Sequence, residues 1–331
     1  MIYGRPKTIF PGLLLLRSPY STAPKASLQL VAQLRKLTDV PISKAREALA
    51  AANNDVEGAL KWLEKDLVVS GAQKAAKVEG RTTREGLVSV CVLSNGAAVV
   101  DGRRGIRASM IELNCETDFV GRNELFRQLA ADIAHTAAFI TEQHGTTPGQ
   151  FITPCSLDVL GDAPLLSQNK PHVQTSATVS SSIRDLIAKI GEKVSLKRAV
   201  TVVHGEETST LGLRLATYLH GATGSPFQGR IGSLAVLGLK SPNLVELMKT
   251  ERFAQDLGKL ERAVGRQIAG FDTRSIRSAH DDETALYNQP FMMLGGEGAN
   301  GSVQAGLERW SREREIGSVD VVEFAKWTVG E

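Results

Sequence analysis

The sequence predicts an α+β protein in which a small helical module precedes two antiparallel sheets, each covered by helices. Apolar residues recur at helical spacing over residues 28–66, 121–143, 182–190 and 244–271. Runs with strand character lie at 86–93, 97–101, 107–113, 196–203, 211–219, 231–239 and 319–329. Helices and strands do not alternate regularly as they do in parallel βαβ units, which favours α+β over a doubly wound α/β fold.

The length and composition fit a globular protein of two or three compact units, with 331 residues, 42% hydrophobic and 23% charged. No apolar run approaches the roughly 18–20 residues of a membrane span, so we expect no membrane segment. The net charge is +3. Four basic residues and no acidic residue lie in residues 1–26, so the rest of the chain carries about −1 and gives no reason to expect a nucleic-acid partner.

Residues 1–26 combine these four basic residues with Ser, Thr and Pro. This composition is typical of a mitochondrial or plastid transit peptide. The apolar stretch Leu13–Leu16 is short for a secretory signal, and a disordered tail is the other alternative. The three cysteines, Cys91, Cys115 and Cys155, are odd in number and far apart, which indicates a reducing compartment rather than a disulfide framework.

Three short helices are predicted between residues 28 and 66, with apolar residues of each on one face. Asn54 and Glu57 fit a capping box at the start of the third helix. The alanine-rich, basic segment 67–85 follows, and its charges favour a solvated linker helix. A nucleic-acid surface is the alternative there, but no aromatic residues interleave with the basic ones.

The most distinctive stretch is 111–126, where an apolar strand ends in a polar turn and an amphipathic helix follows. One interpretation is helix capping, in which Thr117 or Asp118 accepts from free backbone N–H groups and Phe119 packs into the core. The other is that Asp118 and Phe119 project together, one carrying charge and the other shape. Cys115 has no histidine nearby in sequence, so we expect a buried or spectator thiol.

Residues 112–120, Glu-Leu-Asn-Cys-Glu-Thr-Asp-Phe-Val, resemble the signature of elongation factor Ts, the nucleotide exchange factor of elongation factor Tu. Further matches extend the resemblance over nearly the whole chain after residue 27. It implies a UBA-like three-helix module that docks on elongation factor Tu, and a core of two subdomains. Bacterial members carry a coiled-coil insertion near residues 272–289, which mitochondrial members lack and this chain also lacks. The implied domains are 1–26 transit peptide, 27–67 module, 68–85 linker helix, 86–204 core subdomain N and 205–331 core subdomain C.

The resemblance also implies the site residues. Asp118 and Phe119 would disturb the nucleotide and magnesium site of elongation factor Tu, and the adjacent Thr117 would belong to the same partner-binding site. Ile190 and Gly191, in a motif where Lys193 replaces the usual Asn, would contact its nucleotide domain. His220 would make a further contact. From local pattern alone, Ile190 and Gly191 fit a core residue and a helix cap, and His220 fits a packed or capping histidine.

These observations predict a nucleotide exchange factor of the mitochondrial matrix that is not an enzyme, with elongation factor Tu as its partner. We expect no cofactor, no metal and no direct nucleotide binding. The sequence has no nucleophile-and-base spacing, no metal-ligand cluster, and no Gly-Lys-Ser/Thr after its glycine-rich segment 295–301. A UBA-type adaptor that binds ubiquitin, suggested by residues 28–66, and an RNA-binding protein, suggested by the basic linker, are the alternatives.

Overall fold

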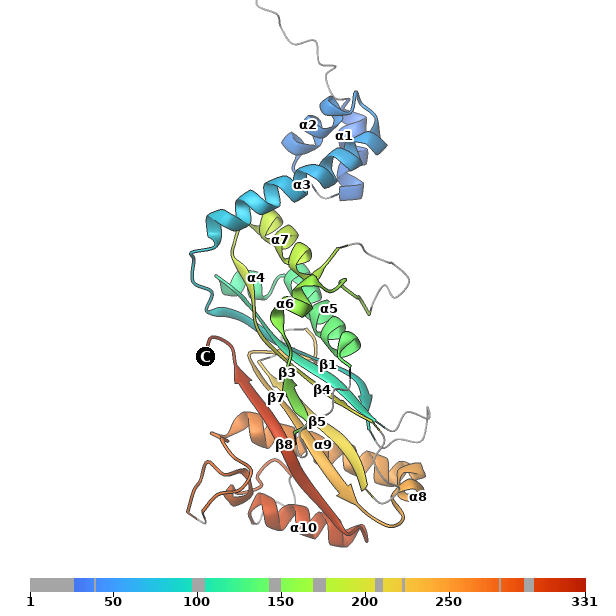
Figure 1. The fold of residues 1–331 in the computed structure, drawn as a ribbon, viewed down its shortest axis with the longest axis vertical. Coiled ribbons are helices and arrows are strands. Elements are labelled where there is room, and N and C mark those ends of the chain that lie inside the picture. The colour runs from blue at the N-terminus through green and yellow to red at the C-terminus, as the bar shows by residue number, and fades with distance from the viewer. Residues whose placement is uncertain are drawn as a thin grey trace, which may run out of the picture. The chain divides into compact units, whose positions relative to one another are not determined.

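The computed structural model describes residues 27–38, 40–96, 105–142, 150–168, 177–205, 211–221, 224–279, 281–294 and 301–331. The chain divides into two compact units, Met1–Val69 and Ser70–Glu331 (Figure 1). Helices and antiparallel sheets occupy separate layers, so the predicted α+β class is confirmed. The predicted strand 97–101 and segment 1–26 lie outside the described residues. Among the residues described, no helix is long and apolar enough to cross a membrane.

The first unit contains α1 (Leu28–Thr38), α2 (Ile42–Ala51) and the first part of α3 (Val56–Val78). Its core is made of small and branched side chains, namely Val31, Leu34, Ala45, Ala48, Leu49 and Ala59. The predicted capping box is wrong, because Asn54 has a positive φ of 64°. Instead, the carboxylate of Asp55 accepts from the Gly58 N–H at 2.7 Å and caps α3.

Helix α3 does not end with the first unit. We predicted a boundary between module and linker helix at residue 67, but the helix runs without interruption to Val78. Residues 59–78 contain no proline and a single glycine, so nothing in the local sequence stops the helix. Its last part belongs to the second unit, where the Lys74 Nζ donates to the Ala188 carbonyl at 2.7 Å.

The second unit contains two antiparallel sheets. The first has the order β3-β4-β2-β1-β6 and is formed by β1 (Glu85–Asn95), β2 (Ile106–Cys115), β3 (Ile152–Pro154), β4 (Val194–His204) and β6 (Gln228–Gly229). The second has the order β5-β7-β8 and is formed by β5 (Leu211–His220), β7 (Ile231–Lys240) and β8 (Ser318–Thr328). The short β6 follows β5 in the chain but pairs with β1, so the C-terminal half contributes to the first sheet.

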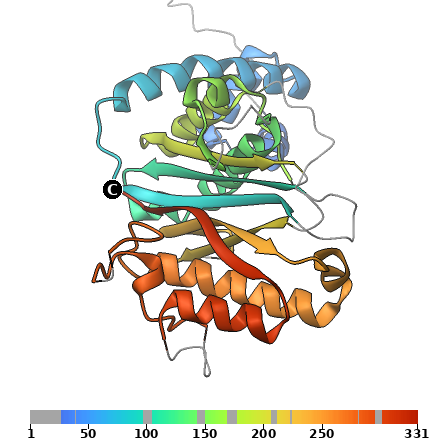
Figure 2. The ribbon, with the colours of Figure 1, turned by 60° about the horizontal axis from the view of Figure 1, so that its bottom comes forward.

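The two sheets pack face to face between two layers of helices (Figure 2). The outer face of the first sheet is covered by α5 (Glu124–Ile140), α6 (Leu157–Asp162) and α7 (Val179–Ile190). The outer face of the second is covered by α8 (Leu244–Lys249), α9 (Glu251–Gly270), the 3₁₀ turn η1 (Leu286–Asn288) and α10 (Val303–Glu313). On β2 the faces alternate: Ile111 and Leu113 contact the helices, whereas Ala108 and Met110 contact the second sheet.

Two predicted helices differ in detail from the structure. The helix predicted over 244–271 is broken at Thr250, which caps the end of α8 and the start of α9. The helix predicted from 121 is preceded by a separate short helix, α4 (Asp118–Gly121). In α5, Phe126, Leu129 and Ile133 are buried as predicted, but Leu125 is 53% exposed because it lies off their face.

Candidate functional site

The turn after β2 projects two side chains out of the second unit. Thr117 is the N-cap of α4, and its Oγ1 accepts from the Val120 N–H at 3.4 Å. Val120 is buried, whereas Asp118 is exposed and Phe119 is 86% exposed. The two interpretations of this turn are therefore both partly right: Thr117 does cap a helix, but Phe119 lies at the surface and not in the core.

Asp118 forms an ion pair with Arg122, one helical turn along the chain, at 3.0 Å between Oδ2 and Nη2. Both side chains are more than half exposed, so the pair contributes at most about 1 kcal/mol to stability. A partner that competes for either group therefore displaces little stabilising energy.

The second predicted contact lies at the end of α7. Gly191 is exposed and has a positive φ of 77°, and its N–H donates to the Ile187 carbonyl at 2.8 Å. Glycine adopts this left-handed conformation without a steric cost from a Cβ, which explains the helix end. Ile190 is partly buried against the core beneath the first sheet. Gly191 thus exposes its backbone at the surface, whereas the Ile190 side chain is partly buried against the core.

Two glutamates that we did not single out connect these turns. The carboxylate of Glu192 accepts from the Thr117 N–H at 3.1 Å and from its hydroxyl at 2.9 Å. The carboxylate of Glu116 accepts from the Lys193 N–H at 2.6 Å. Both glutamates stand inside motifs that carried the family resemblance, and that position was the only signal the sequence offered for them.

His220 ends β5 and is exposed. Its carbonyl accepts from the Arg230 N–H at 2.8 Å, and the next residue, Gly221, lines a pocket that also contains Asp118. His220 is therefore one residue from a pocket shared with the Asp118 turn. Its side chain is not among the residues that line that pocket.

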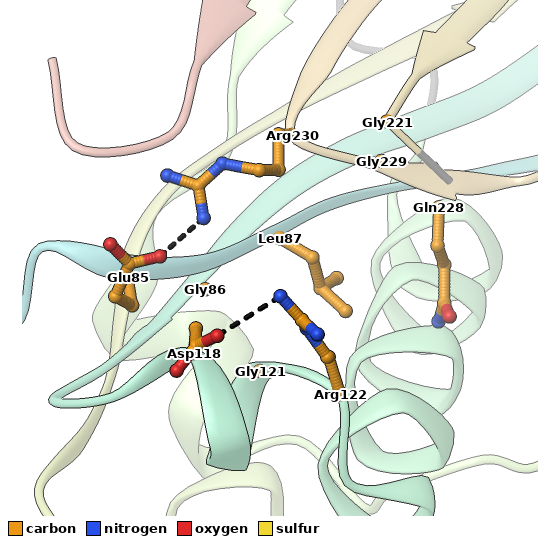
Figure 3. Close-up of a pocket in the computed structure, with 10 residues that line it drawn as sticks. All are labelled: Glu85, Gly86, Leu87, Asp118, Gly121, Arg122, Gly221, Gln228, Gly229 and Arg230. Carbon is orange, nitrogen blue, oxygen red and sulfur yellow. Dashed lines mark hydrogen bonds and ion pairs between the residues drawn. The ribbon is translucent and has the colours of Figure 1, made fainter. Parts of the chain in front are cut away.

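This pocket has a volume of about 170 Å³ and is lined by Glu85, Gly86, Leu87, Asp118, Gly121, Arg122, Gly221, Gln228, Gly229 and Arg230 (Figure 3). Its charges are matched in pairs, since Arg122 reaches Asp118 and Arg230 reaches Glu85. Gly86 has a positive φ of 140°, and a Cβ there would lie 2.2 Å from the Leu113 carbonyl oxygen. Glycine at this position lets the start of β1 approach β2 closely beside the projecting turn.

Within the described part of the chain, no group of three or more His, Cys, Asp or Glu side chains is arranged to hold a metal ion. The acidic side chains at the turn instead bind protein groups, as Asp118, Glu116 and Glu192 show. The turn exposes an aromatic ring and a carboxylate, and these groups can bind the surface of another protein.

Cys115 lies directly under the turn and is fully buried, as we predicted for a spectator thiol. Its Sγ–H donates to the Thr117 carbonyl at 3.1 Å. Burial, and to a smaller extent the nearby Glu192 carboxylate, raises the pKa of this thiol to about 12. Burial also raises the pKa of Cys91 to about 11 and that of the half-buried Cys155.

We therefore expect thiol labelling at pH 8 to discriminate among the three cysteines. The thiolate is the reactive form, and a pKa of about 12 leaves roughly one Cys115 thiol in ten thousand ionised at pH 8. Cys155 should react first with Ellman's reagent, and Cys91 and Cys115 only after unfolding by guanidinium. A Cys155→Ser variant should lack the fast phase. Fast labelling of that variant without denaturant would contradict the burial of the other two thiols.

Comparison with known proteins gives a consistent result along the chain. The family model described as "Elongation factor TS" matches residues 116–289. A protein of Coprinopsis cinerea named "Elongation factor Ts, mitochondrial" is 54% identical, over 94% of each chain. A Laccaria bicolor protein of the same name is 53% identical, over 94% of each chain. "Elongation factor Ts, mitochondrial 2" of Postia placenta is 51% identical, over 94% of this chain and 95% of that protein.

Proposed function

The chain belongs to the elongation factor Ts family, and from this we propose that it binds elongation factor Tu in mitochondria and accelerates the release of GDP. GTP would then bind the emptied site and complete the exchange. The observation that carries the proposal is the projecting turn, since Phe119 is 86% exposed on a capped and anchored backbone. No bond in a substrate is made or broken, so the protein is an exchange factor and not an enzyme.

The proposed mechanism uses Phe119 as a wedge and Asp118 as a charge. Phe119 enters between helices of the partner, where its exposed ring gains the burial that it lacks in the free protein. Asp118 then disturbs the polar network that holds Mg²⁺ and its waters in the partner. Without the metal, the diphosphate charge is poorly compensated and GDP leaves faster.

Exchange of this kind obeys thermodynamic reciprocity. If this protein weakens nucleotide binding by a given factor, nucleotide weakens the binding of this protein by the same factor. The complex of both proteins with nucleotide is therefore transient. Thr117 supports the turn through its cap, and it lies close enough to Asp118 to contact the partner as well.

Gly191, Ile190 and His220 are the remaining proposed contacts. Gly191 supports this role because its exposed backbone adjoins Glu192, which binds Thr117 of the projecting turn. Ile190 offers only the part of its side chain that the core leaves open. His220 is exposed and adjoins the pocket that includes Asp118. These contacts would widen the interface around the wedge.

We further propose the domain arrangement that the resemblance implied, with one change. Residues 27–67 form the docking module, but its third helix, α3, continues to Val78, so the linker helix is not separate from the module. Leu37 and Ile42, which are exposed on either side of the α1–α2 connection, are apolar groups that suit docking on elongation factor Tu. Residues 1–26 would direct the chain to the mitochondrial matrix.

Stopped-flow release of a fluorescent GDP from mitochondrial elongation factor Tu tests the function. The chain without residues 1–26 is expected to raise the release rate at least 100-fold at micromolar concentration, since coupling of about 3 kcal/mol corresponds to that factor. Bovine serum albumin at the same concentration serves as the control. A release rate that stays at the control value, with this protein folded by circular dichroism, would refute the proposal.

A further inference from the structure

Two glutamates from different turns each bind the backbone of the other turn. We call Glu116 and Glu192 the carboxylate clamp. Glu192, which follows Gly191, binds both the N–H and the hydroxyl of Thr117. Glu116, which precedes Thr117, binds the N–H of Lys193. The clamp therefore closes in both directions between segments about 75 residues apart in the chain.

The hydrogen bonds of the carboxylate clamp are charge-assisted and partly shielded from water. Bonds from N–H groups to an ionised carboxylate are about twice as strong as those between neutral groups. The side chain of Glu116 is only 21% exposed, so water competes little with its bond to Lys193. Glu192 is also partly buried. Neither carboxylate is a freely solvated surface charge.

The segment that follows α3 also contacts Glu116 and Lys193. Arg81 Nη1 lies 3.2 Å from Glu116 Oε1, and Lys193 Nζ donates to the Glu79 carbonyl. The bond to Glu116 uses the Lys193 backbone, so it does not depend on the side chain, which is instead free to bind Glu79.

The turn needs such support, because α4 has four residues and is exposed on its Asp118–Phe119 side. A helix this short is not stable by itself. Ordering a loose turn during association would cost binding free energy, which a turn already held in place avoids. Arg122 alone does not supply this order, since its pair with Asp118 is exposed on both sides.

We propose that Glu116 and Glu192 are positioning residues for nucleotide exchange. They hold Asp118 and Phe119 in a fixed relation to Gly191, so that the partner meets both turns as one preformed surface. This inference rests on the proposed function, and it adds two residues that act through the turns without touching the nucleotide.

A Glu192→Gln variant tests the inference, with Glu251→Gln on α9 as the matched control. The amide keeps the size of the side chain but loses its charge, and it can accept at only one oxygen. The rate of GDP release at sub-saturating protein is expected to fall about five- to ten-fold, because ordering the turn then costs binding free energy, with the control unchanged. Hydrogen exchange of the Thr117 and Val120 amides should accelerate by a similar factor, and the far-UV spectrum should not change.

A double-mutant cycle with Thr117→Val distinguishes positioning from a general loss of stability. Thr117→Val removes the hydroxyl that Glu192 binds and keeps the N–H, so if Glu192 acts through Thr117, the loss in the double variant should be smaller than the product of the two single losses. Fully multiplying effects, or a Glu192→Gln variant in which either the sub-saturating rate or the amide exchange is unchanged, would overturn the inference. Glu116→Gln provides the second test from the other side of the clamp.

Failure of the proposed function would look different. If even the unmodified chain does not accelerate GDP release, the proposed function fails, while amide exchange still reports whether Glu192 orders the turn. If the unmodified chain accelerates release and the amides of Glu192→Gln remain protected, the function stands and the inference fails.

Discussion

Replacing Phe119 with alanine is expected to reduce the acceleration of GDP release by about 100-fold at sub-saturating concentration, as for an aromatic hot spot worth 2–3 kcal/mol. The ring is 86% exposed in the free protein, so its removal takes no packing from the core. The melting temperature of Phe119→Ala should therefore stay within about 1 °C of the unmodified chain. This combination of intact stability and lost exchange is what a wedge residue predicts.

Phe139→Ala is the matched control for this prediction. Phe139 is 61% exposed and lies near the C-terminal end of α5, whereas the Asp118 turn precedes the start of that helix. Both variants remove one exposed phenyl ring, so a nonspecific effect of surface hydrophobicity should appear in both. Release rates from stopped-flow titrations of the two variants give the comparison. Equal losses in both variants, or full activity of Phe119→Ala, would exclude the wedge.

Several features of this site were predictable from sequence because they are local. The strand into β2 alternates apolar residues, and the change to helical spacing after residue 120 marks the turn. The local sequence does not show whether the side chain of Phe119 or that of Val120 packs into the core. Thr117 fixes the start of α4, which turns Val120 inward and leaves Phe119 outside.

The features that sequence reasoning missed depend on contacts between distant segments. The bonds between Glu192 and Thr117 span 75 residues, and no spacing rule joins two acidic residues to backbone groups so far away. The pairing of β6 with β1 rests on two residues from the opposite half of the chain. The continuity of α3 to Val78 was missed for another reason: no residue around Val69, where the first compact unit ends, interrupts the helix.

Glu112 is a fully buried glutamate that binds groups from both sheets. It lies on β2 with its side chain inaccessible to solvent, and β-sheet register places it opposite Arg198. Arg198 Nε donates to Glu112 Oε2 at 2.6 Å, and the Gly330 N–H donates to Oε1 at 3.0 Å. The Arg198 guanidinium also stacks over the Trp327 ring at 4.6 Å. Glu112 thereby ties the end of β8, in the second sheet, to the centre of the first.

Glu112→Ala is therefore expected to destabilise the second unit by about 3 kcal/mol, because it leaves Arg198 Nε and the Gly330 N–H without their acceptor. That loss corresponds to a fall in melting temperature of about 5–10 °C for a unit of this size. Differential scanning calorimetry measures the fall, and hydrogen exchange should show loss of protection at the Gly330 amide. Arg198 is partly exposed, so water can compensate some of its charge, which places the expected value at the low end for a buried pair.

Glu246→Ala supplies the contrast, since Glu246 pairs with Lys249 at 2.7 Å with both side chains at least half exposed. Its removal should change stability by less than about 0.5 kcal/mol. Both variants replace a glutamate with alanine. The difference between their melting temperatures therefore reports the burial of Glu112 and its bonds to Arg198 on β4 and Gly330 after β8. A Glu112→Ala melting temperature no lower than that of Glu246→Ala would mean that β8 is held to the first sheet by the apolar residues between the sheets alone. In that case Trp327→Ala, which removes part of that apolar contact, should be the variant that releases the C-terminal strand.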